Sequence, residues 1–189
     1  MFNTLFNTKV YYIHGFGSTT ESPTIEMLRK EFPDAVGLDY DHNDPDVSIS
    51  LMVSEIIAND YFKNNVLIVG SSLGGWYAEQ LTKNIVADYI LYNPATQPEF
   101  SLGKYGVDPI VLEKYELLSR SSNSSLPTSN RTVILCSDDL VIDPKFADIK
   151  YKDCASMIYT TGSHRMTEDN MQIIVSRIKY LQNQPPQLR

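Results

Sequence analysis

The sequence predicts an α/β fold, a three-layer α/β/α sandwich around a mostly parallel sheet of about six strands. The first observation is that short apolar runs, typical of buried strands, alternate with longer amphipathic runs typical of helices. The second is the length, because 189 residues suffice for one domain with a core and are too few for two comfortable ones. The third is the apolar content of 42%, which excludes disordered and fibrous classes. We therefore expect residues 1–189 to form a single domain.

Strands and helices follow one another along most of the chain. Strands are predicted at residues 9–13, 35–40, 66–70, 89–92, 132–136 and 155–159. Helices are predicted at residues 24–32, 47–61, 74–85, 108–118 and 167–181, where apolar residues recur at helical spacing. Ile25, Leu28 and Phe32, for example, share one face of the first helix. Right-handed crossovers would then cover both faces of the sheet with helices.

The segment 94–130 interrupts this alternation. It lies between two predicted strands and ends in a serine-rich stretch, SRSSNSSLPTSN, at residues 119–130. Two interpretations stay open for it: a small cap or flexible lid over a binding site, or a solvated connector. The final residues, 183–189, are predicted to be a flexible tail.

The charge and hydropathy of the chain exclude several classes of partner. The formal net charge is −7, and an acidic chain repels phosphate backbones, so we expect no nucleic-acid partner. No apolar run approaches the about 18 residues that span a bilayer. The first residues lack the basic stretch and the long apolar core of a signal peptide. These features predict a cytoplasmic protein without a membrane partner.

Neither the cysteines nor the acidic residues predict a metal site. Cys136 and Cys154 lie in or beside apolar strand-like segments, and we expect both thiols to be reduced and buried. The acidic loop at residues 39–46 has side chains at the spacing of a calcium loop, but it lacks the glycine at position six and the glutamate at position twelve. This loop is better interpreted as the cap of the helix that follows it. We expect neither a metal nor another cofactor.

A candidate nucleophile lies in the stretch VLIVGSSLGGWYAEQL, residues 66–81. A G-x-S-x-G motif indicates a nucleophilic serine when a buried strand turns there sharply into a helix, and this stretch has that arrangement. The turn is so tight that residues two positions away on either side must be small, which Gly70 and Gly74 are. Ser71 lacks such flanking, because Val69 stands two residues before it. The candidate nucleophile is therefore Ser72.

A serine hydroxyl needs a base and an acid that orients the base. Hydrolases with a serine at such an elbow have the chain order serine, acid, histidine, and His164 alone among the three histidines follows Ser72. The acid should follow the strand before the histidine's strand, where CSDDLVIDP supplies several aspartates. We choose Asp139, because the acid of such hydrolases commonly stands two residues before a valine and Val141 fits that spacing. Asp138 is kept as the alternative. Asp143 precedes a proline and is interpreted as a helix cap.

Attack on a carbonyl also requires donors for the developing oxyanion. The residue after the nucleophile, Leu73, would supply one backbone N–H at the start of a helix. The loop HGFGS at residues 14–18 follows the first strand, and Phe16 would supply the second N–H. Gly15 and Gly17 would let this backbone turn into a substrate-binding pocket, and His14 would shape the loop through hydrogen bonds.

Together these segments resemble the α/β-hydrolase superfamily and, more narrowly, the small bacterial YqiA-type esterases. The matching segments are HGFGS, GSSLGGWYA, LYNPATQP, DDLVIDP and GSH, which occur in the family's order over residues 10–181. The resemblance implies a minimal α/β-hydrolase fold without the first strands of the larger fold, and esterase activity on short acyl esters. Carried over by position, it supports Ser72, Asp139 and His164. The family pattern has glycine directly before the acid, where this chain has Asp138.

Two functions from different classes follow from these residues. The first is a serine hydrolase with esterase activity, which cleaves small-molecule esters of short carboxylic acids, or thioesters, through an acyl-enzyme on Ser72. The second is a non-catalytic binding protein on a hydrolase scaffold. The sequence favours the enzyme, because every expected catalytic position holds a competent residue.

Overall fold

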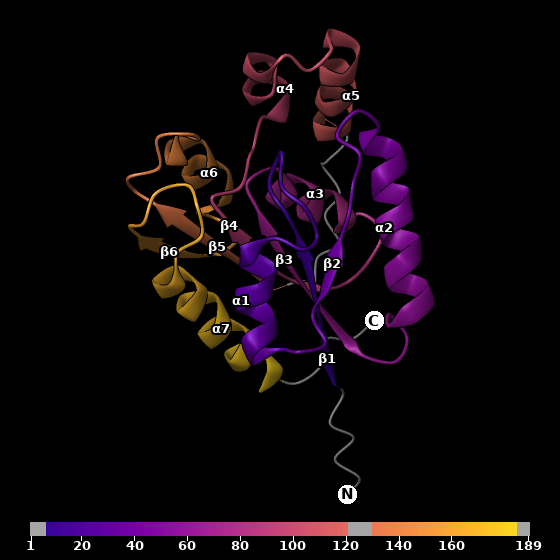
Figure 1. The fold of residues 1–189 in the computed structure, drawn as a ribbon, viewed down its shortest axis with the longest axis vertical. Helices are drawn as coiled ribbons and strands as arrows, with labels where there is room; N and C mark the ends of the chain where they lie inside the picture. The colour runs from indigo at the N-terminus through magenta and orange to yellow at the C-terminus, as the bar shows by residue number, and fades with distance from the viewer. Residues whose placement is uncertain (1–6, 121–129, 185–189) are drawn as a thin grey trace, which may run out of the picture.

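Six parallel strands form the centre of the fold within residues 7–120 and 130–184, the parts of the chain that the computed structural model describes (Figure 1). They are β1 (Thr8–Ile13), β2 (Val36–Leu38), β3 (Asn65–Ser71), β4 (Asp88–Tyr92), β5 (Arg131–Cys136) and β6 (Ser156–Thr160). Their order across the sheet is β2-β1-β3-β4-β5-β6, and every neighbouring pair is parallel. The predicted α/β class is confirmed. The sheet is fully parallel within the described residues, where the sequence predicted a mostly parallel one.

Helices connect these strands and close the chain. They are α1 (Pro23–Glu31), α2 (Pro45–Asn59), α3 (Leu73–Leu81), α4 (Pro98–Ser101), α5 (Pro109–Arg120), α6 (Pro144–Tyr151) and α7 (Glu168–Gln182), with a 3₁₀ turn, η1 (Gly103–Tyr105). The short elements α4, η1 and α6 were not predicted. In α6 only Ala147 and Tyr151 are buried, so the apolar pattern is too short to indicate a helix. The start of α6 agrees with the prediction that Asp143 caps a helix. The Asp143 side chain accepts from the Lys145 backbone N–H at 3.0 Å.

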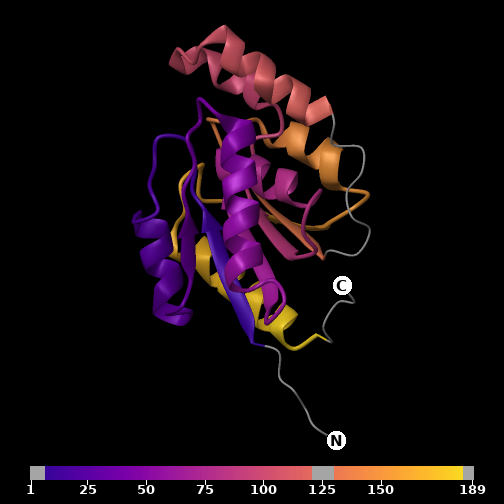
Figure 2. The ribbon, with the colours of Figure 1, turned by 90° about the vertical axis from the view of Figure 1, so that its right-hand side faces the viewer.

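The two faces of the sheet are covered by different helices (Figure 2). Successive strand residues point to opposite faces. In β1, Tyr11 and Ile13 join a core with α2, α3, α5 and α6, whereas Val10 and Tyr12 join a core with α1 and α7. Each central strand therefore has buried residues on both faces, which explains why these strands are continuous apolar runs in the sequence.

All six strands are parallel, so their carboxyl ends lie at the same edge of the sheet. Helices α4 and α5 lie beyond that edge (Figure 1). The segment that contains α4, η1 and α5, here called the cap, is anchored at its α5 end to α3. The Trp76 indole N–H donates to Ser119 Oγ at 2.9 Å, and the Tyr77 and Tyr115 hydroxyls lie 2.9 Å apart. The described part of the segment 94–130 thus contains α4, η1 and α5, and residues 121–129 lie outside the described residues. Most of the predicted tail, residues 185–189, also lies outside them.

The expectation for the two thiols was half wrong. Both cysteines are free and Cys136 is buried in β5, but Cys154 is exposed. Cys154 lies in the turn before β6, a strand at the edge of the sheet whose residues are only partly covered. In the described segments, no helix is long and apolar enough to cross a membrane.

Candidate active site

Ser72 stands at the turn from β3 into α3, in a strained backbone conformation. Its φ is 53° and its ψ −120°, a region that a non-glycine residue rarely adopts. A Cβ on Gly70 would lie 2.5 Å from the Gly74 carbonyl oxygen, and a Cβ on Gly74 would lie 2.1 Å from the carbonyl oxygen of Ile13. Both positions therefore require glycine, as expected for a nucleophile elbow.

The turn after β4 supports this elbow from the side. The Ser72 N–H donates to the Tyr92 carbonyl at 3.0 Å, and the Ser72 carbonyl accepts from the backbone N–H of Ala95 at 2.9 Å. A Cβ on Gly75 would lie 2.7 Å from Cβ of Pro94. Close contact between these two turns explains why a second glycine follows the motif, a role that the sequence alone did not reveal.

Ser71 has a different environment from its neighbour. Its hydroxyl lies 3.0 Å from the Tyr12 hydroxyl, and Tyr12 belongs to the core shared with α1 and α7. No histidine contacts the Ser71 side chain within the described residues. The local geometry thus distinguishes the two serines in the way that the flanking glycines suggested.

Hydrogen bonds link Ser72, His164 and Asp139 in a chain. His164 Nε2 lies 2.9 Å from Ser72 Oγ, and His164 Nδ1 lies 2.7 Å from Asp139 Oδ2. An ionised carboxylate only accepts, so Nδ1 carries the hydrogen. Nε2 of a neutral imidazole is then free to accept the serine proton. The Asp139 side chain is 1% exposed, so little water competes for this bond.

The adjacent aspartates contact different parts of the histidine loop. Asp139 Oδ1 accepts from the backbone N–H groups of Val141 and Ile142 at 2.8 and 3.0 Å, which orients Oδ2 toward His164. Asp138 instead accepts from the backbone N–H groups of Gly162 and Ser163. These N–H groups stabilise the ionised form and lower the pKa of the exposed Asp138 carboxyl. The structure therefore brings Asp139, and not Asp138, to the imidazole.

Buried polar side chains hold the loop that carries His164. Asn93 Nδ2 donates to the Ser163 carbonyl at 3.0 Å, and Asn170 Nδ2 donates to the Thr161 carbonyl at 2.9 Å. The Tyr92 hydroxyl also contacts the Ser163 carbonyl, at 3.3 Å. Burial raises the pKa of Tyr92, which therefore stays a neutral hydrogen-bond donor. Sequence reasoning missed these roles; the motif LYNPATQP pointed to the right segment without assigning a role to its side chains.

The loop after β1 lies directly against Ser72. A Cβ on Gly15 would approach the Ser72 Cβ to 3.2 Å, so glycine lets the backbone come close to the hydroxyl. Gly17 has a φ of 71°, and the loop closes with a bond from the Ser18 N–H to the Gly15 carbonyl. Leu73 is the first residue of α3, so its N–H has no acceptor within the helix. The geometry is thus compatible with donors from Phe16 and Leu73.

The His14 side chain is buried beneath this loop. Its Nδ1 lies 2.9 Å from the Gly15 carbonyl oxygen, and its Nε2 lies 3.2 Å from Asp39 Oδ1. The ring also stacks on Tyr40 with centroids 4.5 Å apart. His14 is only 3% exposed, which fits a role in shaping the loop better than direct contact with substrate.

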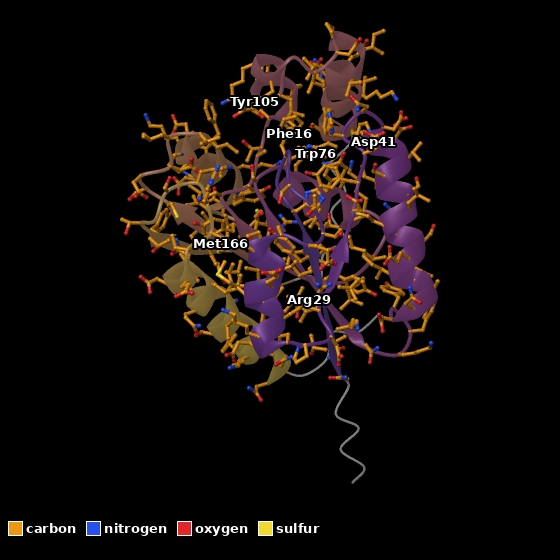
Figure 3. The ribbon with its side chains drawn as sticks, viewed as in Figure 1. Phe16, Arg29, Asp41, Trp76, Tyr105 and Met166 are labelled. Atoms are coloured by element: carbon orange, nitrogen blue, oxygen red, sulfur yellow. The ribbon has the colours of Figure 1, made fainter. Side chains whose placement is uncertain are left out.

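Aromatic rings connect the loop after β1 with the cap. Phe16 and Tyr105 of η1 lie near one another (Figure 3), with ring centroids 5.4 Å apart. The Phe16 ring also meets the His42 ring edge-on, with centroids 4.9 Å apart. Lys104 Nζ donates to the Val141 carbonyl at 3.2 Å, in the loop that carries Asp139. The turn η1 therefore contacts both the loop that carries Phe16 and the loop that carries Asp139.

The acidic loop before α2 is held by a hydrogen bond within the loop and by an ion pair with α5. Asp41 accepts from the Asn43 backbone N–H at 2.9 Å, and Lys114 of α5 contacts Asp44 at 2.6 Å. Within residues 7–120 and 130–184, no group of three or more histidine, cysteine or acidic side chains is arranged to hold a metal ion. Asp44 is the N-cap residue of α2, but its side chain makes no cap hydrogen bond.

Solved structures with the same fold include two esterases. Est1E from Butyrivibrio proteoclasticus matches with a TM-score of 0.74 at 14% identity, over 95% of this chain and 90% of that chain. An esterase from Pyrococcus furiosus matches with a TM-score of 0.64 at 16% identity, over 92% of this chain and 83% of that chain. The mouse α/β-hydrolase domain-containing protein 10 matches with a TM-score of 0.61 at 15% identity, over 92% of this chain and 88% of that chain. At such identities the matches show the α/β-hydrolase fold alone.

The sequence itself matches one family model, over residues 9–182. This range contains the elbow, the loop after β1, the cap and the segments that carry Asp139 and His164. The resemblance to the YqiA-type proteins and to α/β-hydrolases is confirmed by this match and by the solved structures together. The chain belongs to the uncharacterised protein family UPF0227.

Proposed function

We propose that the protein is a serine hydrolase with esterase activity, which cleaves short acyl esters or thioesters through an acyl-enzyme on Ser72. The observation that carries this proposal is the hydrogen-bond chain from Ser72 Oγ through His164 to Asp139, with bonds of 2.9 and 2.7 Å. The fold shared with esterases supports a hydrolase but names no substrate.

In the first half of the reaction, Ser72 Oγ attacks the carbonyl carbon of the ester. Its proton passes to His164 Nε2, and the imidazolium is stabilised by the Asp139 carboxylate. The negative charge on the carbonyl oxygen is met by the backbone N–H groups of Phe16 and Leu73. When the tetrahedral intermediate collapses, the bond to the alcohol oxygen breaks, and the alcohol leaves with the proton from Nε2.

In the second half, water replaces the alcohol. His164 Nε2 takes one proton from the water as its oxygen attacks the acyl carbon on Ser72. Collapse of the second intermediate releases the carboxylic acid and returns the proton to Ser72 Oγ. These steps consist of proton transfers and acyl transfers, so the cycle needs no redox or metal chemistry.

The aromatic contact at the cap suggests which acyl groups would fit. Phe16 and Tyr105 would present flat, apolar surface beside the reacting carbonyl. Est1E, which shares the fold, has also been solved with ferulic acid bound. We therefore include esters of both short aliphatic and aromatic acids among the candidate substrates.

A panel of esters and thioesters of graded acyl length, including an aryl acid ester, would test this proposal. We expect turnover of at least one short acyl ester by the wild type, and a loss of at least about 10⁴-fold in kcat for Ser72→Ala. Ser71→Ala is the matched control and should stay within about three-fold of the wild type, because its hydroxyl faces Tyr12. No turnover of any panel member, or equal turnover by Ser72→Ala, would favour the non-catalytic binding protein.

A further inference from the structure

The loop that carries His164 has an unfavourable backbone conformation. Gly162 has a φ of 128°, and Ser163 has a φ of 68° although it is not a glycine. A non-glycine residue in this region costs free energy, so the surrounding structure must hold it there. Any relaxation of this backbone would move the imidazole, because His164 follows directly.

Asp138 meets the N–H side of that strained segment. Its Oδ1 accepts from the backbone N–H groups of Gly162 and Ser163, each at 3.0 Å, and its Oδ2 lies 3.2 Å from the Gly162 nitrogen. Hydrogen bonds to an ionised carboxylate are about twice as strong as neutral ones. The Asp138 side chain is otherwise exposed, so these bonds determine its orientation.

The carbonyl side of the same segment is held from the interior. Asn93 and Tyr92 donate to the Ser163 carbonyl, and both residues are buried. The peptide units around Ser163 are therefore fixed from two directions, by buried donors below and by the Asp138 carboxylate at the surface. With only the interior contacts, the N–H groups of Gly162 and Ser163 would turn to water and the strain could relax.

We propose that Asp138 is a positioning residue for His164: its carboxylate holds the strained backbone of residues 162–163 so that the imidazole bridges Ser72 and Asp139. The two neighbouring aspartates thereby divide one task, since Asp139 orients the ring and Asp138 orients the backbone that bears it. This role rests on the proposed function, in which His164 is the general base.

The test compares Asp138→Ala with Asp138→Asn in the full chain. Alanine removes the acceptor, and we expect kcat to fall about 10- to 100-fold with KM within about two-fold, because a misplaced base slows chemistry more than binding. Asparagine keeps one oxygen that can accept from both N–H groups, so it should restore kcat to within about three-fold of the wild type. Asp153→Ala, which removes another exposed carboxylate, is the control and should behave as the wild type.

Amide hydrogen exchange at Gly162 and Ser163 supplies a readout that needs no activity. We expect both amides to exchange at least about 10-fold faster in Asp138→Ala than in the wild type, with little change in Asp138→Asn. Unchanged exchange, a kcat for Asp138→Ala equal to that of the control, or an asparagine variant as slow as the alanine variant would overturn the proposal. If Ser72→Ala keeps full turnover, the proposed function fails instead, and the exchange result still decides whether Asp138 holds the loop.

Discussion

Replacing His164 with alanine should lower kcat at least about 10³-fold, because Ser72 would lose the group that accepts its proton. The His164 Nε2 atom lies 2.9 Å from Ser72 Oγ, and no other histidine contacts that hydroxyl within the described residues. Steady-state kinetics on the best ester of the panel would measure the loss. Arg165→Ala, which truncates the exposed neighbour, is the matched control and should keep kcat within about three-fold. Near-normal turnover by His164→Ala would remove His164 from the proposed mechanism.

Asp139→Asn should lower kcat by about 10²- to 10⁴-fold, because the amide would impose the wrong tautomer on His164. Asp139 Oδ1 accepts from two backbone N–H groups, of Val141 and Ile142, so the amide oxygen would take that place. The amide NH₂ would then face His164 Nδ1, which would have to accept. The imidazole hydrogen would move to Nε2, where it faces Ser72 and blocks proton transfer.

Asp138→Asn provides the comparison for this second prediction, since it makes the same chemical change one residue earlier. Its kcat should exceed that of Asp139→Asn by at least about 10-fold, and the urea midpoints of both variants would show whether either has simply lost stability. The reverse ranking of the two kcat values would transfer the role of the acid to Asp138.

Local patterns in the sequence predicted the features that short segments encode. The run of apolar residues before Gly70 and the glycines around Ser72 predicted a strand, a sharp turn and a helix, because each depends on neighbours within a few residues. The turn requires Gly74 for a contact with Ile13, however, and that contact between distant segments was visible only in the structure. The fold class could thus be predicted from the alternation of apolar and amphipathic segments, whereas the packing that makes the elbow rigid could not.

Long-range contacts account for what the sequence did not predict. Asn93 and Asn170 hold the histidine loop from elements far apart in the chain, and isolated asparagines carry no periodic signal. The ambiguity between Asp138 and Asp139 had the same origin. Their chemistry is identical, and only the direction of each side chain after β5 decides that one meets the imidazole and the other the backbone of residues 162–163.

The exposure of Cys154 shows a different reason why a prediction from the sequence was wrong. The apolar segment beside it is a strand at the edge of the sheet, and half-covered edge strands contain the same residue types as buried ones. The helical elements of the cap were missed for another reason: α4 and η1 are too short to show a helical pattern of apolar residues. Its aromatic contact with Phe16 depends on a single side chain, Tyr105.

Covalent labelling with a fluorophosphonate probe, followed by mapping of the modified peptide, tests most directly whether Ser72 is an activated nucleophile. Such probes react with serines whose hydroxyl is activated by a base. We expect one phosphonyl group on Ser72 in the wild type and in Ser71→Ala, and none in Ser72→Ala. A wild type that stays unlabelled, or equal labelling of Ser72→Ala, would contradict the account.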